Sequence, residues 1–448
     1  MARAQVTDLV VVLPGILGSR LADAEGRAVW DLSGPALLRG LRSFGGSVSA
    51  LRLPKDTGDG DPGDGVVPVG LMPDLHALPG IWHPVDGYTD LLRWLERHFT
   101  LSVSDNLLTF PYDWRLSCRN AAERLKGRID LELERWRASA PERREARVVF
   151  LCHGMGGLVA RHYAERLGGH EVTRRVITLG TPHRGSLRAL ADLVDGGGLR
   201  DPEPGAFARS LPSLHQLVPD HACMEGPGGL AHVRDLPALP GVDEALLADA
   251  ARFHADLRGT PPRAELFAIA GAGQPTAVTA RYAGDRLTLA SEGDGDGTVP
   301  LPGGARPENG PAGGRPGGPA AGSWAAYEQH GSLQNNKAVR EALRGLLGEE
   351  PVLPPGAGQL SDPAARLGVR VPPVLSAGVP YEVTVTAPDD ARLMAELRPA
   401  DGGRPVTRPL RSLGGGRHAA AFPPPEPGAY RLSVGPVTAL SLIRRSAL

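Results

Sequence analysis

The chain has 448 residues, enough for a large catalytic domain followed by a smaller accessory domain. Its net charge of −1 leaves no overall field that would attract nucleic acid or an anionic membrane, so we expect no nucleic-acid partner. Three widely spaced cysteines, Cys118, Cys152 and Cys223, exclude a disulfide framework and match no zinc pattern. We therefore expect no metal or other cofactor, and a reducing, cytoplasmic compartment.

The first apolar run, residues 9–17, predicts a buried strand over Asp8–Leu13 and a turn over Pro14–Ser19. The run is too short to span a bilayer, and no small-residue cleavage site follows it. We therefore expect neither a signal peptide nor a transmembrane helix.

Strands and helices alternate through the next part of the chain. Helices are predicted over residues 88–98, 121–138, 158–167 and 335–347, and strands over residues 107–110, 147–152, 175–179 and 265–270. This alternation predicts an α/β fold, with a mostly parallel sheet and helices on both faces. A helical, loop-rich excursion over residues 187–258 predicts a cap or lid, and the low-complexity residues 302–322 predict a disordered loop.

The composition and the hydrophobic pattern of the sequence change after residue 350. A Pro/Gly linker over residues 351–358 separates a first domain, 1–350, from a second, 359–448. The second carries short alternating runs at residues 381–386, 393–397, 417–422 and 430–434, which predict a small β-sandwich of immunoglobulin type. We expect a passive accessory domain, with binding of a protein partner as the alternative.

An apolar strand, a tight turn and a helix meet at residues 148–161. This arrangement is typical of the nucleophile elbow of α/β-hydrolases, written G-x-S-x-G. Here the pattern runs from Cys152 to Gly156, with Gly154 at the apex where the attacking serine should stand. The sequence thus predicts the scaffold of a serine hydrolase that lacks its nucleophilic hydroxyl.

Hydrolases of this fold place nucleophile, acid and histidine in that chain order. Asp296, in a glycine-flanked turn after a strand-rich segment, suits the acid that orients the histidine; Asp294 is its rival. His330 lies on a loop before the predicted helix 335–347 and is the expected third member.

An oxyanion hole needs two N–H groups aimed at the developing negative charge. One is expected from Met155, at the start of the helix that follows the elbow. The other is expected from the turn after the first strand, at Ile16 or Leu17, where flanking glycines allow close approach of the backbone.

Seven segments together resemble the lecithin:cholesterol acyltransferase family, which includes phospholipid:diacylglycerol acyltransferases and bacterial lipase or acyltransferase relatives. They occur in this order: Val12–Ser19, Phe110–Arg115, His153–Gly157, Leu179–Ser186, Leu211–Leu214, Gly295–Pro300 and His330–Leu333. The resemblance covers roughly residues 8–347. It implies an α/β-hydrolase core that moves a fatty acyl group from a phospholipid to an alcohol or water.

Position by position, the resemblance places the acid on Asp296, the histidine on His330, the serine on Gly154 and the oxyanion donors on Leu17 and Met155. It implies a lipid or acyl-ester ligand. In the predicted lid, residues 188–195 have two interpretations, a helix that contacts a membrane surface or an ordinary core-facing helix, and the second is favoured.

Glycine at the apex leaves four hypotheses. The chain is a non-catalytic pseudoenzyme that binds a lipid or a protein; or Asp296 and His330 activate a water; or Cys152 supplies the nucleophile; or the glycine is an engineered or erroneous replacement in an active acyltransferase. The thiol hypothesis is weakest, because Cys152 lies two residues before the apex on the strand. Without the serine, only about 10³–10⁴-fold catalysis over water is expected to remain.

Overall fold

The computed structural model describes residues 3–31, 51–55, 57–73, 75–78, 81–195, 202–237, 239–258, 263–284, 286–304, 323–348, 360 and 366–444. Within these ranges, the main sheet has six parallel strands in the order β15-β12-β9-β8-β1-β7. Their bounds are β1 (Leu9–Leu13), β7 (Leu107–Thr109), β8 (Val148–His153), β9 (Thr173–Leu179), β12 (Glu265–Ala272) and β15 (Ser323–Tyr327).

Both faces of this sheet are buried, which explains its uninterrupted apolar strands. Successive side chains of a strand point to opposite faces. In β1, Leu9, Val11 and Leu13 therefore enter one hydrophobic cluster, while Val10 and Val12 enter the other.

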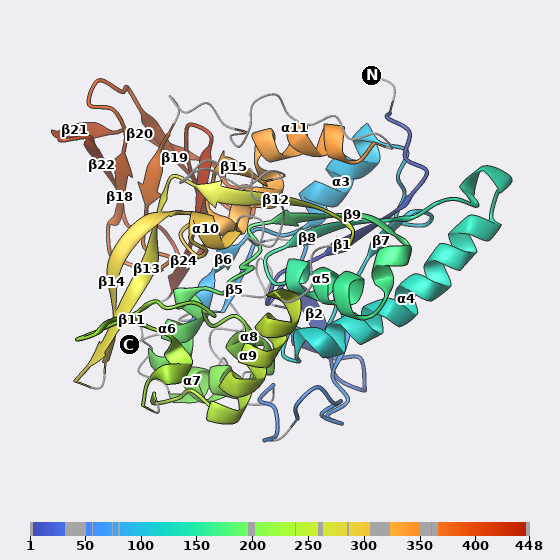
Figure 1. Cartoon of the computed structure of the whole chain (residues 1–448). Helices are drawn as coiled ribbons and strands as arrows, with labels where there is room; N and C mark the ends of the chain where they lie inside the picture. The colour runs from blue at the N-terminus through green and yellow to red at the C-terminus, as the bar shows by residue number, and fades with distance from the viewer. Residues whose placement is uncertain are drawn as a thin grey trace.

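Helices cover each face. α3 (Thr89–His98) and α11 (Lys337–Leu346) pack on one face, and α4 (Cys118–Ala138) and α5 (Gly156–Arg166) pack on the other (Figure 1). The Asn336 side chain accepts the N–H groups of Ala338 and Val339 and so caps the start of α11. The predicted α/β-hydrolase architecture is confirmed; β15 is the strand of this sheet that the sequence analysis did not predict.

A smaller antiparallel region follows β1. β2 (Ser19–Ala22) lies between β3 (Ala28–Trp30) and β4 (Val67–Leu71), and β5 (His76–Leu78) pairs with β6 (Ile81–Val85). It holds the turn after β1 against the body of the molecule, since Trp30 is buried and belongs to the same core as Leu13.

The predicted cap contains α6 (Leu187–Asp195), α7 (Pro202–Arg209), α8 (Pro212–Gln216) and α9 (Glu244–Arg258). It also contains a hairpin, β10 (Met224–Gly226) and β11 (Gly229–Ala231), which pairs with the long hairpin of β13 (Gln274–Ala283) and β14 (Arg286–Gly295). Leu187, Leu190 and Leu193 of α6 are buried in the main core. α6 is therefore a core-facing helix, the interpretation that the sequence favoured over a lipid-contacting one.

Two sheets form the C-terminal part. One has the order β16-β18-β22-β21 and the other β17-β24-β23-β19-β20, with all pairs antiparallel except β17–β24. The bounds are β16 (Gly368–Arg370), β17 (Val374–Ser376), β18 (Tyr381–Thr386), β19 (Met394–Pro399), β20 (Val406–Pro409), β21 (Arg411–Gly414), β22 (Arg417–Phe422), β23 (Gly428–Val434) and β24 (Val437–Arg444).

One part of the predicted disordered loop is ordered. Residues 302–304 belong to a short helix, α10 (Leu301–Gly304), in which Gly303 and Gly304 are buried. The prediction was wrong there because the pair packs near the main sheet: a Cβ on Gly304 would lie 3.2 Å from the Ala270 Cβ. The rest of that loop and the predicted linker 351–358 lie outside the described residues.

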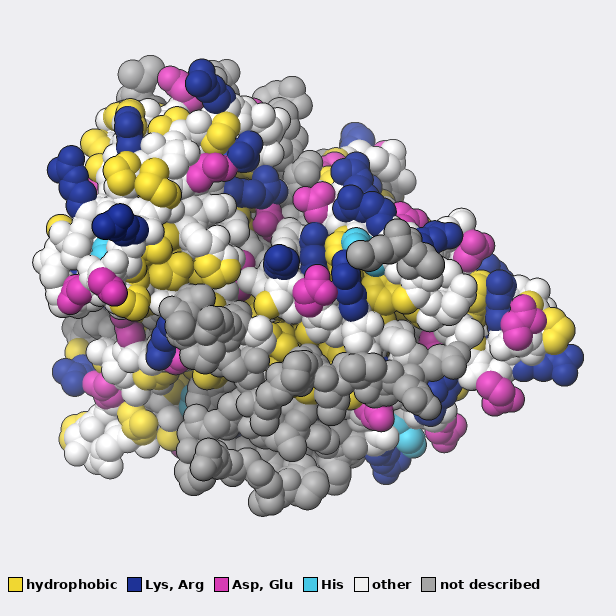
Figure 2. Space-filling view, turned by 90° about the horizontal axis from the view of Figure 1, so that it is seen from above, with side chains coloured by type: hydrophobic (Ala, Val, Ile, Leu, Met, Phe, Trp, Pro, Cys, Tyr) yellow, Lys and Arg dark blue, Asp and Glu magenta, His cyan; other side chains and the backbone are white. Residues whose placement is uncertain are grey.

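Basic and acidic side chains are interspersed over the face seen in Figure 2, as the net charge of −1 leads one to expect. Among the described helices, none has both the length and the apolar character needed to cross a bilayer.

Candidate active site

The elbow turn is the two-residue connection between β8 and α5. Gly154 has φ +51°, in the left-handed region that L-residues rarely adopt. Its N–H donates to the Leu179 carbonyl at 2.9 Å, and its carbonyl accepts the Thr181 hydroxyl at 2.8 Å. The backbone is thus held in the tight turn that, in α/β-hydrolases, exposes a nucleophile.

The glycine after the turn is required by packing. A Cβ on Gly156 would lie 2.6 Å from the Pro14 carbonyl oxygen and 2.9 Å from the Leu13 Cβ. The start of α5 can therefore reach the turn after β1 only without a side chain at this position.

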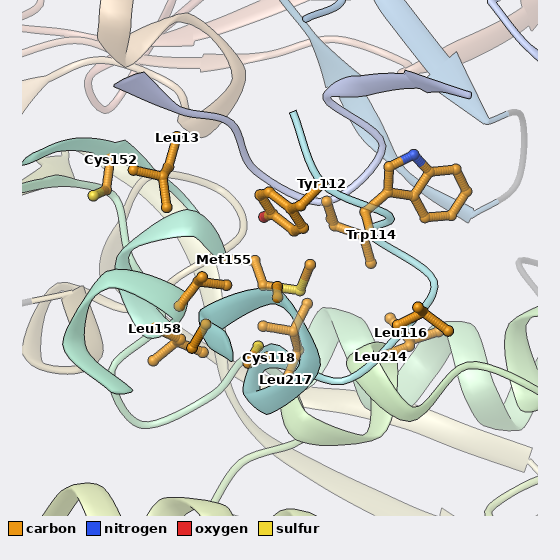
Figure 3. Packing of buried hydrophobic residues seen from close by; sticks show 14 of the residues in the cluster. Leu13, Tyr112, Trp114, Leu116, Cys118, Cys152, Met155, Leu158, Leu214 and Leu217 are labelled. Carbon is orange, nitrogen blue, oxygen red and sulfur yellow. The ribbon is translucent and has the colours of Figure 1, made fainter. Parts of the chain in front are cut away.

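Cys152 occupies the position before the turn where hydrolase elbows carry another glycine. It pairs with Leu13 across β1 and β8, and both side chains lie in the same packed cluster (Figure 3). Burial raises the pKa of the Cys152 thiol well above its ordinary value, so the thiolate is disfavoured. The side chain is part of the core and is not at the apex of the turn.

Asp296 and His330 form a buried pair. His330 Nδ1 donates to Asp296 Oδ2 at 2.9 Å, and the other carboxylate oxygen accepts the N–H groups of Thr298 and Val299 at 2.9 and 2.6 Å. With Nδ1 bonded to the acid, the other ring nitrogen faces the elbow. A Cβ on Gly154 would lie 3.3 Å from His330 Nε2. The structure brings together Asp296, His330 and Gly154, the three residues to which the sequence analysis assigned the acid, the histidine and the nucleophile position.

The rival acid, Asp294, lies in a different environment. Its carboxylate accepts the Gly273 N–H at 2.6 Å and pairs with Arg366 at 3.0 Å. The contact with His330 is made by Asp296.

The turn after β1 approaches the elbow closely. A Cβ on Gly154 would lie 3.5 Å from the Gly15 Cα. Leu17, at φ +65°, is the one non-glycine residue with positive φ among the described residues, and its carbonyl accepts the Trp30 indole N–H at 3.0 Å. Within the described part of the chain, the N–H groups of Leu17 and Met155 have no acceptor. Backbone N–H groups are the donors from which an oxyanion hole is built, and Leu17 and Met155 remain its predicted donors.

Two residues that the sequence analysis did not single out connect these parts. His153 Nε2 donates to the His330 carbonyl at 2.9 Å, and the Tyr88 hydroxyl meets His153 Nδ1 at 3.0 Å. The Tyr88 oxygen also accepts the Gly15 N–H at 2.9 Å. Since a carbonyl can only accept, His153 carries its proton on Nε2, and each bond in the series then has one donor and one acceptor. His153 was visible in the sequence as the neighbour of Gly154, whereas no sequence signal marked Tyr88.

A cavity of about 260 Å³ reaches Asp296 and His330 from the side of the C-terminal sheets. Its wall includes residues of α6, of the β13–β14 hairpin and of β16. Gly154 does not line it.

Comparison with known proteins gives a family match over part of the chain. Residues 84–200 match the family model of lecithin:cholesterol acyltransferase. This span contains the elbow and ends after α6, so it includes neither Asp296 nor His330. No curated protein matches the chain significantly.

Several solved structures are distantly similar. The Tle4-Tli4 complex is 17% identical with a TM-score of 0.49, over 77% of this chain and 98% of that one. The propeptide form of the lipase BlEst2 from Bacillus licheniformis is 12% identical with a TM-score of 0.36, over 96% and 72%. The phospholipase PlaB from Legionella pneumophila with thio-NAD is 12% identical with a TM-score of 0.33, over 61% and 56%. Residues 84–200 are thus similar to the lecithin:cholesterol acyltransferase family, and the six-stranded parallel sheet that carries the elbow, with helices on both faces, has the architecture of an α/β-hydrolase.

Proposed function

We propose that this chain binds acyl esters of lipids in an acyltransferase-like site, and that the missing hydroxyl at Gly154 strongly impairs acyl transfer and ester hydrolysis. The observation that carries the proposal is the Asp296–His330 pair, bonded at 2.9 Å, with Nε2 facing Gly154. In this site Asp296 orients the imidazole, and the N–H groups of Leu17 and Met155 stabilise the negative charge on the ester oxygen. The family match supports the ester class.

The residual chemistry follows from what the site retains. His330 can take a proton through Nε2, so a water beside Gly154 would be its substrate for direct, slow hydrolysis. The second candidate is a pseudoenzyme that binds a lipid or a protein without turnover. It has the same arrangement of Asp296, His330 and Gly154. Both candidates leave no covalent acyl intermediate on residue 154. The three cysteines, all buried and unbridged, support the proposed cytoplasmic location.

The test is hydrolysis of a short-chain p-nitrophenyl ester by the full chain and by Gly154→Ser. Restoring the hydroxyl opposite His330 is expected to raise kcat/KM by several orders of magnitude, up to about 10⁶-fold, since removal of a triad serine costs about 2 × 10⁶ in kcat. Gly154→Ala is the matched control, because it adds the same Cβ without the hydroxyl. His330→Ala in the serine background should abolish the gain.

Two results would contradict the proposal. One is wild-type turnover equal to that of Gly154→Ser; the other is a serine variant no more active than Gly154→Ala. His330→Ala in the wild-type background separates the two candidates. It should slow the ester hydrolysis if His330 activates a water, and it should change nothing if the chain is a pseudoenzyme without turnover. A fluorophosphonate probe should label Gly154→Ser and leave the wild type unlabelled.

A further inference from the structure

The loop that carries His330 lies between the hydrolase part and the C-terminal sheets. It follows β15 and contains a short 3-10 helix (His330–Asn335). On the hydrolase side, the His330 N–H donates to the Asp296 carbonyl at 2.9 Å, in addition to the bond between their side chains. A short 3-10 helix has few bonds of its own, so its position depends on the groups that pack against it.

The C-terminal sheets bond to the two residues that precede His330. The Glu328 carboxyl group accepts the Thr438 N–H of β24 at 2.7 Å. The Gln329 side-chain amide donates to the Val369 carbonyl of β16 at 2.9 Å. Each of the two C-terminal sheets, one with β24 and the other with β16, therefore contacts the loop beside the histidine.

The residue that follows His330 is enclosed between two strands. A Cβ on Gly331 would lie 2.3 Å from the Pro84 carbonyl oxygen of β6 and 3.3 Å from Leu440 Cδ1 of β24. β24 lies beside β6 (Figure 1). Position 331 therefore has no room for a side chain, and the loop is packed tightly on the C-terminal sheets.

An ion pair joins the C-terminal sheets to the same loop. Arg431 of β23 contacts Asp86 through Nε at 2.9 Å and through a terminal nitrogen at 2.7 Å. Asp86 follows β6; its N–H donates to the Gly331 carbonyl at 2.8 Å, and its carbonyl accepts the Gln334 amide at 3.0 Å. The Asp86 side chain is only 4% exposed, so removing the arginine would leave a buried carboxylate without its charge partner.

Another ion pair across this interface differs in both respects. Arg366 pairs with Asp294 of β14 at 3.0 Å, and their side chains are 60% and 32% exposed. Exposed ion pairs contribute little to stability, because water and salt screen them. The Arg431–Asp86 pair is more buried and acts on the histidine loop itself.

We propose that the C-terminal sheets position His330: they hold the loop of residues 328–334 so that the imidazole keeps its place between Asp296 and Gly154. Arg431 is a positioning residue in this contact, and it acts through Asp86. Displacement of a reacting group by about 1 Å can cost a site about 10²-fold in rate. The benefit to ester chemistry rests on the proposed function, whereas the hold on the loop does not.

The first test is amide hydrogen exchange of the full chain, measured by mass spectrometry on peptides that cover residues 328–334. Arg431→Gln and Asp86→Asn should each speed exchange in this loop about tenfold or more, since each removes a charge-assisted contact of a buried group. The double variant should show no larger effect than the stronger single variant, because both changes break the same link.

Arg366→Gln and Ile129→Val are the matched controls. The first breaks an ion pair across the same interface but away from the loop. The second trims a fully buried side chain of α4 and so lowers the stability of the whole chain. At a temperature well below the melting midpoint, neither should speed exchange in the loop.

A proton NMR signal reports on the histidine directly. The His330 Nδ1–H, buried and bonded to Asp296, is expected as a far-downfield signal in the wild type, and His330→Ala identifies it by its loss. Arg431→Gln should broaden this signal through exchange with water. Arg366→Gln and Ile129→Val should leave it sharp, because lower stability alone does not expose the imidazole of a folded chain.

Turnover gives a separate readout in the Gly154→Ser background. There Arg431→Gln should lower kcat and leave KM unchanged, because the arginine contacts the histidine loop through Asp86. A serine variant that gains no activity would contradict the proposed ester function, and exchange and NMR would still decide this proposal.

Four results would overturn the proposal. They are unchanged loop exchange in Arg431→Gln, an equal increase in either control, additive effects in the double variant, and a His330 signal that is absent from the wild type or stays sharp in Arg431→Gln. Each of these would leave the gain of activity expected for Gly154→Ser untouched.

Discussion

Gly154 and Leu17 both have positive φ on the two turns that meet in the candidate site. A glycine meets this requirement without cost, whereas leucine is held in place at a cost of about 1–2 kcal/mol. The indole of Trp30, bonded to the Leu17 carbonyl and buried beside Trp114 with ring centroids 5.2 Å apart, helps to hold that turn. Both turns of the candidate site thus have the positive-φ backbone, although residue 154 has no side chain.

Adding a side chain at the apex should cost stability. The backbone of Gly154 has φ +51°, and a new Cβ would lie 3.3 Å from His330 Nε2, tighter than ordinary contact. We expect Gly154→Ala and Gly154→Ser each to lower the free energy of unfolding by about 1–2 kcal/mol. Urea unfolding measures this, and an alanine variant more stable than the wild type would show that the turn is relaxed.

Cys152 should be dispensable for chemistry. Its side chain is buried in the core, and burial raises the pKa of its thiol. Cys152→Ala should therefore leave any ester turnover unchanged while lowering stability by about 1 kcal/mol through the small cavity that it creates. Labelling with a thiol reagent in the folded state should be slow. Loss of turnover in Cys152→Ala would instead support the thiol hypothesis.

At the scale of elements, the site depends on how closely α5 approaches β1. Gly156 allows that contact, because a Cβ there would overlap the Pro14 carbonyl oxygen at 2.6 Å. We expect Gly156→Ala to destabilise the chain by about 1–3 kcal/mol through overpacking.

Gly127→Ala is the matched control for this prediction. Gly127 is exposed within α4, and a Cβ there would meet nothing within 4 Å. Alanine should stabilise that helix by up to about 1 kcal/mol. Thermal melting of the two variants should therefore shift in opposite directions; shifts of the same sign would mean that the contact of α5 with β1 does not limit stability.

At the scale of the whole molecule, the C-terminal sheets are part of one continuous structure with the hydrolase part. Their core includes Ala272, Ala325 and Tyr327 of β12 and β15. Arg431 of β23 pairs with Asp86 at 2.7 Å, and Glu328 accepts the Thr438 N–H at 2.7 Å. The accessory domain predicted from sequence thus also lines the cavity next to His330.

Glu328 should make stability depend on pH. Burial raises its pKa to about 8 from 4.5, although the Thr438 and Gln329 N–H groups and the Asn336 amide donate to it. Between these values the folded chain holds a proton that the unfolded chain has released. The contribution to stability is therefore complete below about pH 4.5 and is lost as pH rises toward 8.

Replacing the Glu328 carboxyl by an amide tests whether Glu328 makes stability depend on pH. Glu328→Gln should remove a slope of up to about 1.4 kcal/mol per pH unit from the free energy of unfolding between pH 5 and 8. Glu382→Gln, at an exposed position of β18, should leave the slope unchanged. An unchanged slope in Glu328→Gln would mean that Glu328 is ionised in the folded chain throughout this range.

Much of the fold could be predicted from local patterns. The strands β1, β8 and β9 are buried on both faces, so each one is a short uninterrupted apolar run in the sequence. The helices α3 and α4 are buried along one side, so their apolar residues recur three and four positions apart. β15 could not be predicted, since its residues, Ser323–Tyr327, are small and few, and neighbouring strands decide their conformation. The sequence analysis did not predict the β13–β14 hairpin either, although its two strands are neighbours in the sequence.

The sequence by itself determined the α/β-hydrolase class, the chain order of Gly154, Asp296 and His330, and the absence of a hydroxyl at Gly154, because these are matters of residue type and spacing. Only the tertiary structure decided that His330 faces Gly154, that Tyr88 and His153 join the two turns, and that Asp86 and Arg431 join the C-terminal sheets to the loop of His330. The physical reason is that hydrogen bonds and cavities depend on atoms brought together from distant segments, and packing, which no local pattern records, places those atoms.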